Sequence, residues 1–277
     1  MKRVVGILAA IAAFTGSAVA ADMAPRAYSK APPVVAPVTS WTGCWISGGG
    51  GYGISRTNHG ESVPSNPAFF PIPNSTSGAD GWLVTAGVGC DYQFNNRWVV
   101  GGFVDGNWSD IKGDYETRIT GAFDASVGES RQRWAWAAGA RIGYLVTPSV
   151  LSYVNAGFSQ MHLDAMNFNR VLGPPGVFTG IQFPGQTFDG VFVGTGFEYA
   201  LDFLPGLFLK SEGRASYYSR KDVLPTCVSA GFVCGGPGIP GRIGPFTDID
   251  SRRPIVYTTK AELVYRFNWS GPLVAKY

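Results

Sequence analysis

Charged residues two positions apart are the side chains of this sequence that could act together chemically. Lys210, Glu212 and Arg214 have this spacing, and so do Lys260 and Glu262. Because side chains of a β-strand alternate between its two faces, each set shares one face of its strand. Acids and bases on a common face can neutralise one another as ion pairs, or can line a polar path for ions. Ten charges, five acidic and five basic, are predicted on the face opposite the apolar residues of their strands: Asp91, Asp105, Arg141, Glu198, Lys210, Glu212, Arg214, Lys260, Glu262 and Arg266.

The cysteines indicate a compartment outside the cytoplasm in which disulfides can form. There are four, and an even number fits an oxidising compartment with two disulfides. Cys227 and Cys234 flank a short glycine-rich segment and are predicted to pair. Cys44 and Cys90 are a second possible pair, because antiparallel strands would bring them to similar heights. A zinc site would need a second close pair of Cys or His residues, so no metal is predicted.

The histidines and glycine motifs give no catalytic centre. His59 is expected in a long loop and His162 at the outer end of a strand. No serine can be placed with a histidine and a carboxylate from these positions, so no catalytic residue and no enzyme is predicted. Gly48, Gly50 and Gly53 match the spacing of a dinucleotide fingerprint, but no helix follows them. These glycines are expected to pack a strand inside a narrow barrel, and no cofactor is predicted.

Composition narrows the class of protein before any element is placed. The chain has 277 residues with 38 glycines, 14% aromatic residues and 15% charged residues, where about 25% charge is usual. Its 22 basic and 19 acidic residues nearly cancel, which argues against nucleic acid as a partner. Hydrophobic content of 45% excludes wholesale disorder. The composition is typical of a β-protein that exposes one face to lipid.

The N-terminus predicts export. Lys2 and Arg3 precede an apolar run from Val4 to Phe14, and Ala18-Val19-Ala20 has the small-residue cleavage pattern of a signal peptide. The apolar run is too short for a transmembrane helix. Four prolines in the following segment predict an extended linker. The predicted organisation is a signal peptide at 1–20, a Pro/Ala-rich periplasmic linker at 21–40, and an outer-membrane β-barrel with a short C-terminal tail at 41–277.

Apolar residues alternate with polar ones from about residue 43, which predicts β-strands with two different faces. The cleanest alternation begins at Trp82 and ends at Phe94. Eight strands are predicted, an even number as bacterial outer-membrane barrels require. They lie near 43–54, 82–94, 98–108, 134–144, 149–160, 191–199, 207–218 and 257–267.

The lengths of the connections indicate the kind of barrel. Short and long connections alternate strictly, as the periplasmic turns and extracellular loops of outer-membrane barrels do. The fold class is therefore predicted to be all-β, an eight-stranded antiparallel up-and-down transmembrane β-barrel. The short connections are Asn95–Arg97, Val146–Pro148 and Leu201–Gly206, and the long ones are 55–81, 110–132, 161–187 and 219–254.

Aromatic residues concentrate near the predicted strand ends, where they would form two belts at the membrane interfaces. Those near the short turns are Trp41, Trp45, Trp98, Tyr144, Tyr199, Tyr265, Phe267 and Trp269. Those near the long loops are Trp82, Trp108, Trp134 and Trp136.

Several motifs in order resemble one family. They are Trp41-Thr42-Gly43, the run from Val99 to Asp105, Arg141-Ile142-Gly143-Tyr144, the run from Val193 to Tyr199, and the closing run from Glu262 to Phe267. Together with the predicted signal peptide and linker, they resemble the small outer-membrane proteins of alphaproteobacteria. The likeness covers about residues 40–277.

The resemblance implies an OmpA-like, porin-like transmembrane barrel in the outer membrane, with both termini in the periplasm. The terminal aromatic of the barrel-assembly signal would be Phe267 or Tyr277. No peptidoglycan-binding C-terminal domain of the OmpA kind follows the barrel motifs. Expected partners are outer-membrane lipids with lipopolysaccharide and the barrel-assembly machinery, with no nucleic acid and a monomeric or weakly oligomeric state.

The predicted function is structural support of the envelope, extending at most to a narrow passive channel for ions or small solutes. Eight strands enclose an interior about wide enough for side chains to fill. The alternative is surface binding of haemin or another ligand through the long loops, motivated by the exposed pair Phe69-Phe70. Space for water in the interior is expected beside small residues: Gly87, Gly89, Gly139, Gly143, Gly194 and Gly196.

Overall fold

The structure is a computed structural model of the whole chain. It describes residues 40–62, 74–117, 126–170, 178–201, 203–228, 244–245 and 249–267. The chain divides into two compact units, Met1–Ala36 and Pro37–Tyr277, and every described residue belongs to the second. The predicted signal peptide, most of the linker and the C-terminal tail therefore lie outside the described residues.

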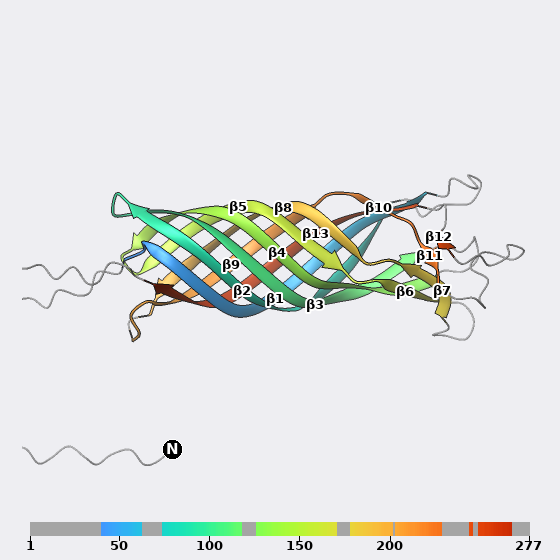
Figure 1. The fold of residues 1–277 in the computed structure, drawn as a ribbon, viewed down its shortest axis with the longest axis horizontal. Coiled ribbons are helices and arrows are strands. Elements are labelled where there is room, and N and C mark those ends of the chain that lie inside the picture. The colour runs from blue at the N-terminus through green and yellow to red at the C-terminus, as the bar shows by residue number, and fades with distance from the viewer. Residues whose placement is uncertain are drawn as a thin grey trace, which may run out of the picture. The chain divides into compact units, whose positions relative to one another are not determined.

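Within the described ranges, eight strands pair into one closed antiparallel ring (Figure 1). Strands β1 and β13 close it, from the pair Cys44 and Phe267 to the pair Ser62 and Ile249. The predicted fold, an eight-stranded antiparallel barrel, is confirmed. In ring order the strands are β1 (Gly43–Ser62), β2 (Ser75–Phe94), β3 (Trp98–Thr117), β4 (Ser126–Thr147), β5 (Val150–Leu163), β8 (Gln186–Ala200), β9 (Leu207–Tyr218) and β13 (Ile249–Phe267).

Short strands extend the sheet at the long-loop end of the barrel (Figure 1). One group continues from β4 through β6 and β7 to β11 and β12, and β10 pairs with β13. The bounds are β6 (Met166–Arg170), β7 (Phe178–Phe183), β10 (Lys221–Val223), β11 (Thr226–Cys227) and β12 (Gly244–Pro245).

The main strands are longer than the sequence predicts. Strand β1 reaches Ser62 and β2 begins at Ser75, so much of the predicted loop 55–81 is paired strand. The same correction applies to 110–132, 161–187 and 219–254, each of which contains strand residues. The reason is that apolar alternation marks only the part of a strand that faces lipid. Beyond it the outer face is polar and the apolar alternation is lost, while backbone pairing continues.

The three short turns are at the predicted places. Asn95 and Asn96 join β2 to β3 with φ angles of 49° and 58°, a left-handed conformation that asparagine tolerates and that tight hairpins require. The second turn lies between Thr147 and Val150. Gly206, with a φ of 85°, ends the third turn, just before β9.

The outer surface of the ring carries an apolar band. Large apolar side chains there are about half exposed, including Val84 and Leu263 at mid-barrel. Trp82 and Trp108 are 57% and 59% exposed and border this band on the long-loop side. On β1 the band ends at Ile54, because the next outward residue is an arginine. No helix among the described residues is long and apolar enough to cross a membrane.

Two residues predicted for the aromatic belt lie inside the barrel instead. Trp41 and Trp45 are 0% and 2% exposed, in a buried cluster that includes Phe103, Phe192 and Phe208. Trp45 alternates with the outward Ile46, so strand parity puts it on the inner face whatever its height. Trp98, Tyr199, Tyr265 and Phe267 do point outward near the turns, each more than 40% exposed. Trp269 lies outside the described residues.

The charged barrel interior as candidate functional site

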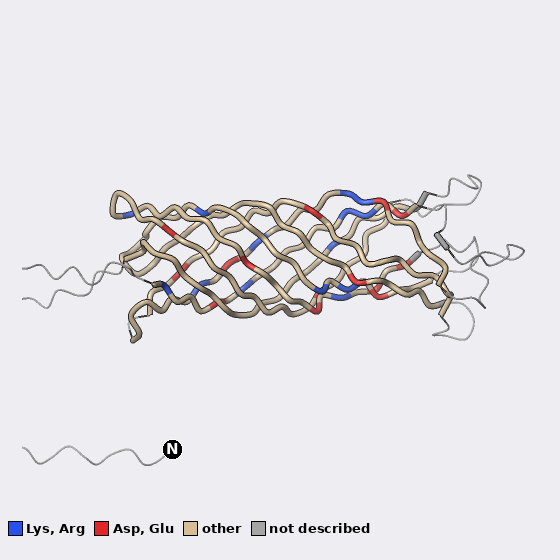
Figure 2. The backbone as a smooth tube through the Cα atoms, viewed as in Figure 1, with Lys and Arg blue, Asp and Glu red and all other residues tan. Residues whose placement is uncertain are grey.

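The ten charged residues predicted to share the inner face are all buried inside the ring, each between 0% and 6% exposed. Figure 2 shows acidic and basic positions mixed along the length of the barrel. The structure divides the ten into two groups, one near the short turns and one farther along the interior.

The first group is a closed cycle of four alternating charges, here called the four-ion ring. Arg266 donates to Asp91 at 2.6 Å and to Glu198 at 2.8 Å. Arg141 donates through Nε to Asp91 at 2.9 Å and through Nη1 to Glu198. The four residues come from β2, β4, β8 and β13, every second strand of the ring. The four-ion ring therefore spans the whole cross-section of the barrel.

Aromatic side chains cover both arginines of the four-ion ring. The Arg141 guanidinium lies 4.7 Å from the centre of the Trp45 ring, and that of Arg266 lies 5.3 Å from Trp41. Arg266 also donates to the backbone carbonyl of Trp41 at 3.0 Å. Stacking on aromatic faces suits the flat, weakly hydrated guanidinium group. Both guanidinium groups are thus covered by aromatic rings.

The second group, here called the six-ion cluster, also balances acids and bases. Arg214 binds Asp105 through both Nη atoms and donates through Nε to Glu212 at 3.0 Å. Lys260 Nζ lies 3.5 to 3.6 Å from three carboxylates, and Lys210 donates to Glu262 at 2.9 Å. The members are Asp105, Lys210, Glu212, Arg214, Lys260 and Glu262.

Neutral groups complete the six-ion cluster and connect it to the four-ion ring. Glu212 accepts hydrogen bonds from Tyr153 at 2.9 Å and from Asn155 at 2.8 Å. The ring of Tyr153 also lies 5.1 Å from the Arg141 guanidinium. Buried charges are tolerated when each is paired and its remaining hydrogen-bonding capacity is used. Every charge of the two groups has a partner of opposite sign, although Lys260 Nζ and Arg266 Nε are buried without a hydrogen-bond partner among the described residues.

Glycine residues in the barrel wall allow large interior side chains to pack closely against it. This corrects the expectation that these glycines leave room for water. A Cβ atom on Gly89 would lie 2.5 Å from the Trp45 ring, and one on Gly139 would lie 2.8 Å from the Phe192 ring. These distances are below van der Waals contact, so the space beside both glycines is occupied by aromatic side chains. The glycines allow close approach of bulky interior groups in a narrow barrel.

A third polar group, missed by the sequence reasoning, lies nearer the long loops. Asp250 accepts hydrogen bonds from Arg252 at 2.6 Å and from Tyr115, and the Arg252 guanidinium stacks on the rings of Tyr115 and Phe183. Burial lowers the pKa of His59, which lies beyond the apolar band, although the nearby Asp250 opposes this shift. One signal could have found this group: Asp250 and Arg252 have the same even-numbered parity as Lys260, Glu262 and Arg266.

The structure also brings a serine to a histidine and a carboxylate, which sequence reasoning could not do. Ser77 Oγ lies 3.1 Å from His59 Nε2, and His59 Nδ1 lies 4.0 Å from Asp250 Oδ1. The second distance is too long for a hydrogen bond. The other oxygen of Asp250 is bound by Arg252 and Tyr115. The residue types match a hydrolase triad, but the histidine is not linked to the acid. His162, by contrast, stacks on Trp134 away from this group.

The three described cysteines lie at opposite ends of the barrel. Cys44 and Cys90 are register partners on β1 and β2 and form a disulfide, with a Cα–Cα distance of 3.9 Å. Cys227 is disulfide-bonded at the long-loop end, and Cys234, its predicted partner, lies outside the described residues. Across the described ranges, no three His, Cys, Asp or Glu side chains are grouped to hold a metal ion.

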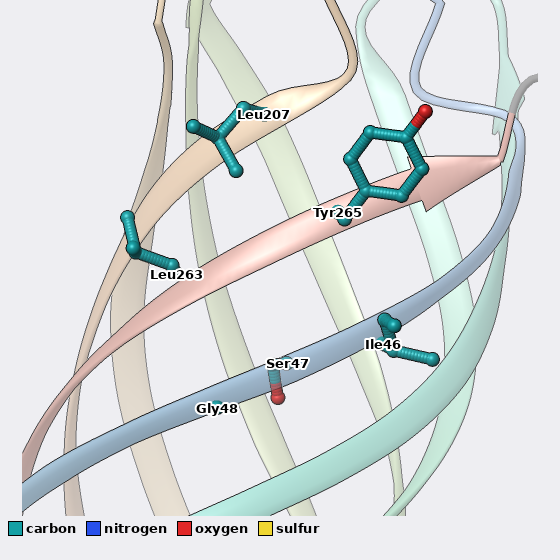
Figure 3. Close-up of a pocket in the computed structure, with 6 residues that line it drawn as sticks. All are labelled: Ile46, Ser47, Gly48, Leu207, Leu263 and Tyr265. Carbon is teal, nitrogen blue, oxygen red and sulfur yellow. The ribbon is translucent and has the colours of Figure 1, made fainter.

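A shallow groove of about 330 Å³ opens on the outer wall, not the interior (Figure 3). Strands β1, β9 and β13 line it, and Gly48 leaves it room because that position has no side chain. Its surface is mainly apolar. The lining residues are Ile46, Ser47, Gly48, Leu207, Leu263 and Tyr265.

A closed ring with charges inside and an apolar band outside fits a membrane-spanning barrel, and a relative gives its location. The chain is 29% identical over 206 residues to a 31 kDa outer-membrane immunogenic protein of Brucella melitensis, covering 73% of this chain and 82% of that protein. The chain is an outer-membrane β-barrel protein. The resemblance to small alphaproteobacterial outer-membrane proteins is confirmed by this relative and by one of the same description from Brucella suis, also 29% identical.

No protein-family model matches the chain. Several solved structures of outer-membrane proteins are similar to it, among them OmpT and OprG. The outer-membrane protease OmpT of Escherichia coli is 10% identical with a TM-score of 0.46, over 81% of this chain and 97% of that chain. The outer-membrane protein OprG of Pseudomonas aeruginosa is 12% identical with a TM-score of 0.42, over 84% of this chain and 100% of that chain.

Proposed function

We propose that the chain is a structural protein of the outer membrane, a barrel whose interior is sealed by paired charges. The four-ion ring is the observation that carries this proposal. It takes one charge from every second strand, and hydrogen bonds from Arg141 and Arg266 link each arginine to both acids. A passing ion would have to separate pairs that are strong in a medium of low dielectric constant.

Planar-bilayer conductance of the refolded chain tests the seal. The wild-type protein is expected to give no discrete steps at high voltage. An Arg141→Ala variant removes one bridge and leaves Asp91 and Glu198 each with one arginine fewer, so we expect it to leak. Arg97→Ala is the matched control, because Arg97 is exposed at a turn and its side chain bonds, among the described residues, only to the outward Tyr144. Discrete wild-type openings that change in Arg141 or Glu198 variants would contradict a sealed barrel.

A narrow passive channel is the second candidate. It is favoured by buried polar atoms that accept no hydrogen bond from any described residue, such as Asn107 Oδ1 and Gln132 Oε1. Such atoms need water, and a chain of waters could carry ions or small solutes past the aromatic rings. The same conductance experiment separates the two candidates, because only the channel gives wild-type steps.

We propose no catalytic role for the chain. This proposal is supported by the geometry at Ser77. His59, which contacts Ser77, lies too far from Asp250 for the hydrogen bond that a catalytic triad needs. Binding of haemin or another ligand by the long loops stays a prediction, since Phe69-Phe70 and the centres of those loops lie outside the described residues.

The proposed partners are outer-membrane lipids, lipopolysaccharide and the barrel-assembly machinery. Phe267 at the end of β13 is 43% exposed on the outer face, where an assembly factor could contact it. A closed ring leaves no strand edge free for pairing, which favours a monomer or a weak oligomer.

A further inference from the structure

Three exposed arginines at the long-loop end of the barrel have no acidic partner in the part of the chain that the structure describes. Arg56 is on β1, Arg253 is on β13, and Arg220 directly precedes β10. Among the described residues, none of the three forms an ion pair or a side-chain hydrogen bond. We call them the arginine row.

The arginine row stands just above the apolar band. Arg56 is the next outward residue after Ile54, which is 52% exposed, and Tyr52 lies one step below that. On β13 the outward Tyr257 lies below Arg253. Figure 2 shows basic positions gathered on the chain near β10 and β13. This height is that of lipid headgroups in the leaflet nearer the long loops, the outer leaflet of the membrane.

The strand register places the three arginines side by side. Arg253 pairs with Asn58, so Arg56 is its diagonal neighbour on the same face, about 7–8 Å away in such sheets. Lys221 pairs with Arg252, which places Arg220 next to Arg253. Like charges this close repel one another, so the arrangement favours an anion between them.

The carboxylates that flank the arginine row are bonded elsewhere. Asp80 accepts a hydrogen bond from the hydroxyl of Tyr52, and Asp222 accepts one from Ser251. Another basic group at the same end differs, because its side chains are paired with a carboxylate. On β3 and β4, Arg131 and Lys112 share the carboxylate of Asp110.

We propose that the arginine row binds the phosphate groups of an anionic glycolipid in the outer leaflet. Guanidinium groups bind phosphate oxygens through paired, charge-assisted hydrogen bonds, and basic clusters beside a membrane attract anionic lipid heads. The aromatic and apolar side chains beneath the row would contact the acyl chains of the same lipid. The inference rests on the proposed lipopolysaccharide partner and assigns that partner a site, but it does not depend on whether the barrel is sealed.

Binding of bisphosphorylated lipid A to the refolded full chain in detergent tests the site. The triple variant Arg56→Gln, Arg220→Gln and Arg253→Gln is expected to bind about tenfold more weakly, because each arginine supplies charged hydrogen bonds. Arg133→Gln is the matched control, since Arg133 is exposed at the same end but paired with Asp164 at 2.8 Å. The control should bind within about twofold of wild type. Heat-modifiable migration on gels verifies that each variant has folded.

Two further probes identify the source of the phosphate. Lipid A without phosphate should bind weakly to wild type, and inorganic phosphate should not displace bisphosphorylated lipid A at equal concentration. The proposal is overturned if the folded triple variant binds lipid A as tightly as wild type. It is also overturned if phosphate-free lipid A binds equally well, or if inorganic phosphate competes at equal concentration. If the triple variant gives no conductance steps in planar bilayers, the closure of the barrel interior does not depend on this site.

Discussion

At the scale of single residues, Glu198 shows how much depends on each buried charge. It accepts hydrogen bonds from both arginines of the four-ion ring and is 0% exposed. Replacing it by alanine would leave Arg141 and Arg266 with uncompensated charge in a buried site. We expect Glu198→Ala to lower the free energy of unfolding by about 3–5 kcal/mol.

Urea titration of the refolded barrel in lipid vesicles measures this effect. Glu129→Ala is a suitable control, because Glu129 is exposed on β4 and forms no ion pair with a described residue. The control should change stability by less than about 0.5 kcal/mol. Equal losses in the two variants would contradict a special role for the buried carboxylate.

Glycine positions give a second residue-scale prediction. Gly89→Ala forces a Cβ atom against the Trp45 ring, whereas the nearest atom to a Cβ on the outward Gly48 lies 4.0 Å away. Overpacking of this kind costs about 1–3 kcal/mol. We expect Gly89→Ala to lower the urea midpoint clearly and Gly48→Ala to leave it nearly unchanged. A neutral Gly89→Ala would mean that Trp45 does not pack against the wall there.

At the scale of elements, the Cys44–Cys90 disulfide joins β1 to β2 at the turn end. It closes a segment with a sequence separation of 46, and the loop-entropy account gives such a crosslink about 2–4 kcal/mol of stability. We expect Cys44→Ser with Cys90→Ser to lower the unfolding free energy by that amount in vesicles. The barrel should still form, because the backbone register of β1 and β2 runs far beyond the crosslink. A double variant as stable as wild type would contradict this estimate.

The Ser77 group gives a second prediction at this scale. Its serine and histidine come from adjacent strands, while Arg252 and Tyr115 hold the acid. A serine without a complete relay is a poor nucleophile. We expect a fluorophosphonate probe to leave the refolded chain unlabelled. Labelling that disappears in Ser77→Ala but persists in Ser109→Ala would contradict the proposal of a non-catalytic barrel.

The elements also show what the sequence could and could not predict. The apolar residues of each strand show which alternate positions face lipid, and the ten charges occupy the other positions. This prediction is possible because lipid-facing strands alternate regularly between apolar and polar residues. The same parity extends to Asp250 and Arg252, but the apolar alternation that marks the strand stops near Tyr257, so the sequence does not show that β13 continues as far as these two residues. Trp45 was misplaced for a different reason. An aromatic residue near a strand end can serve an interfacial belt or the interior, and only its parity relative to Ile46 distinguishes them.

At the scale of the whole barrel, the usual distribution of residues is reversed. The apolar side chains form the outer wall. The interior holds the ten predicted charges in two balanced groups packed with aromatic rings, and the buried pair Asp250 and Arg252 lies nearer the long loops. This arrangement is stable only where the outer wall meets lipid, since water would favour the opposite arrangement. The 15% charged residues and the 38 glycines follow from the same reversal, because the outer wall avoids charge and the narrow interior needs small residues.

Quenching of tryptophan fluorescence by brominated lipids tests this reversal most directly. Single-tryptophan variants would retain either Trp108, which points outward, or Trp45, which lies inside. In vesicles of lipids brominated near the headgroup, we expect strong quenching of Trp108 and little quenching of Trp45. Strong quenching of Trp45 with a protected Trp108 would contradict a barrel that keeps its charges inside and faces lipid with its apolar wall.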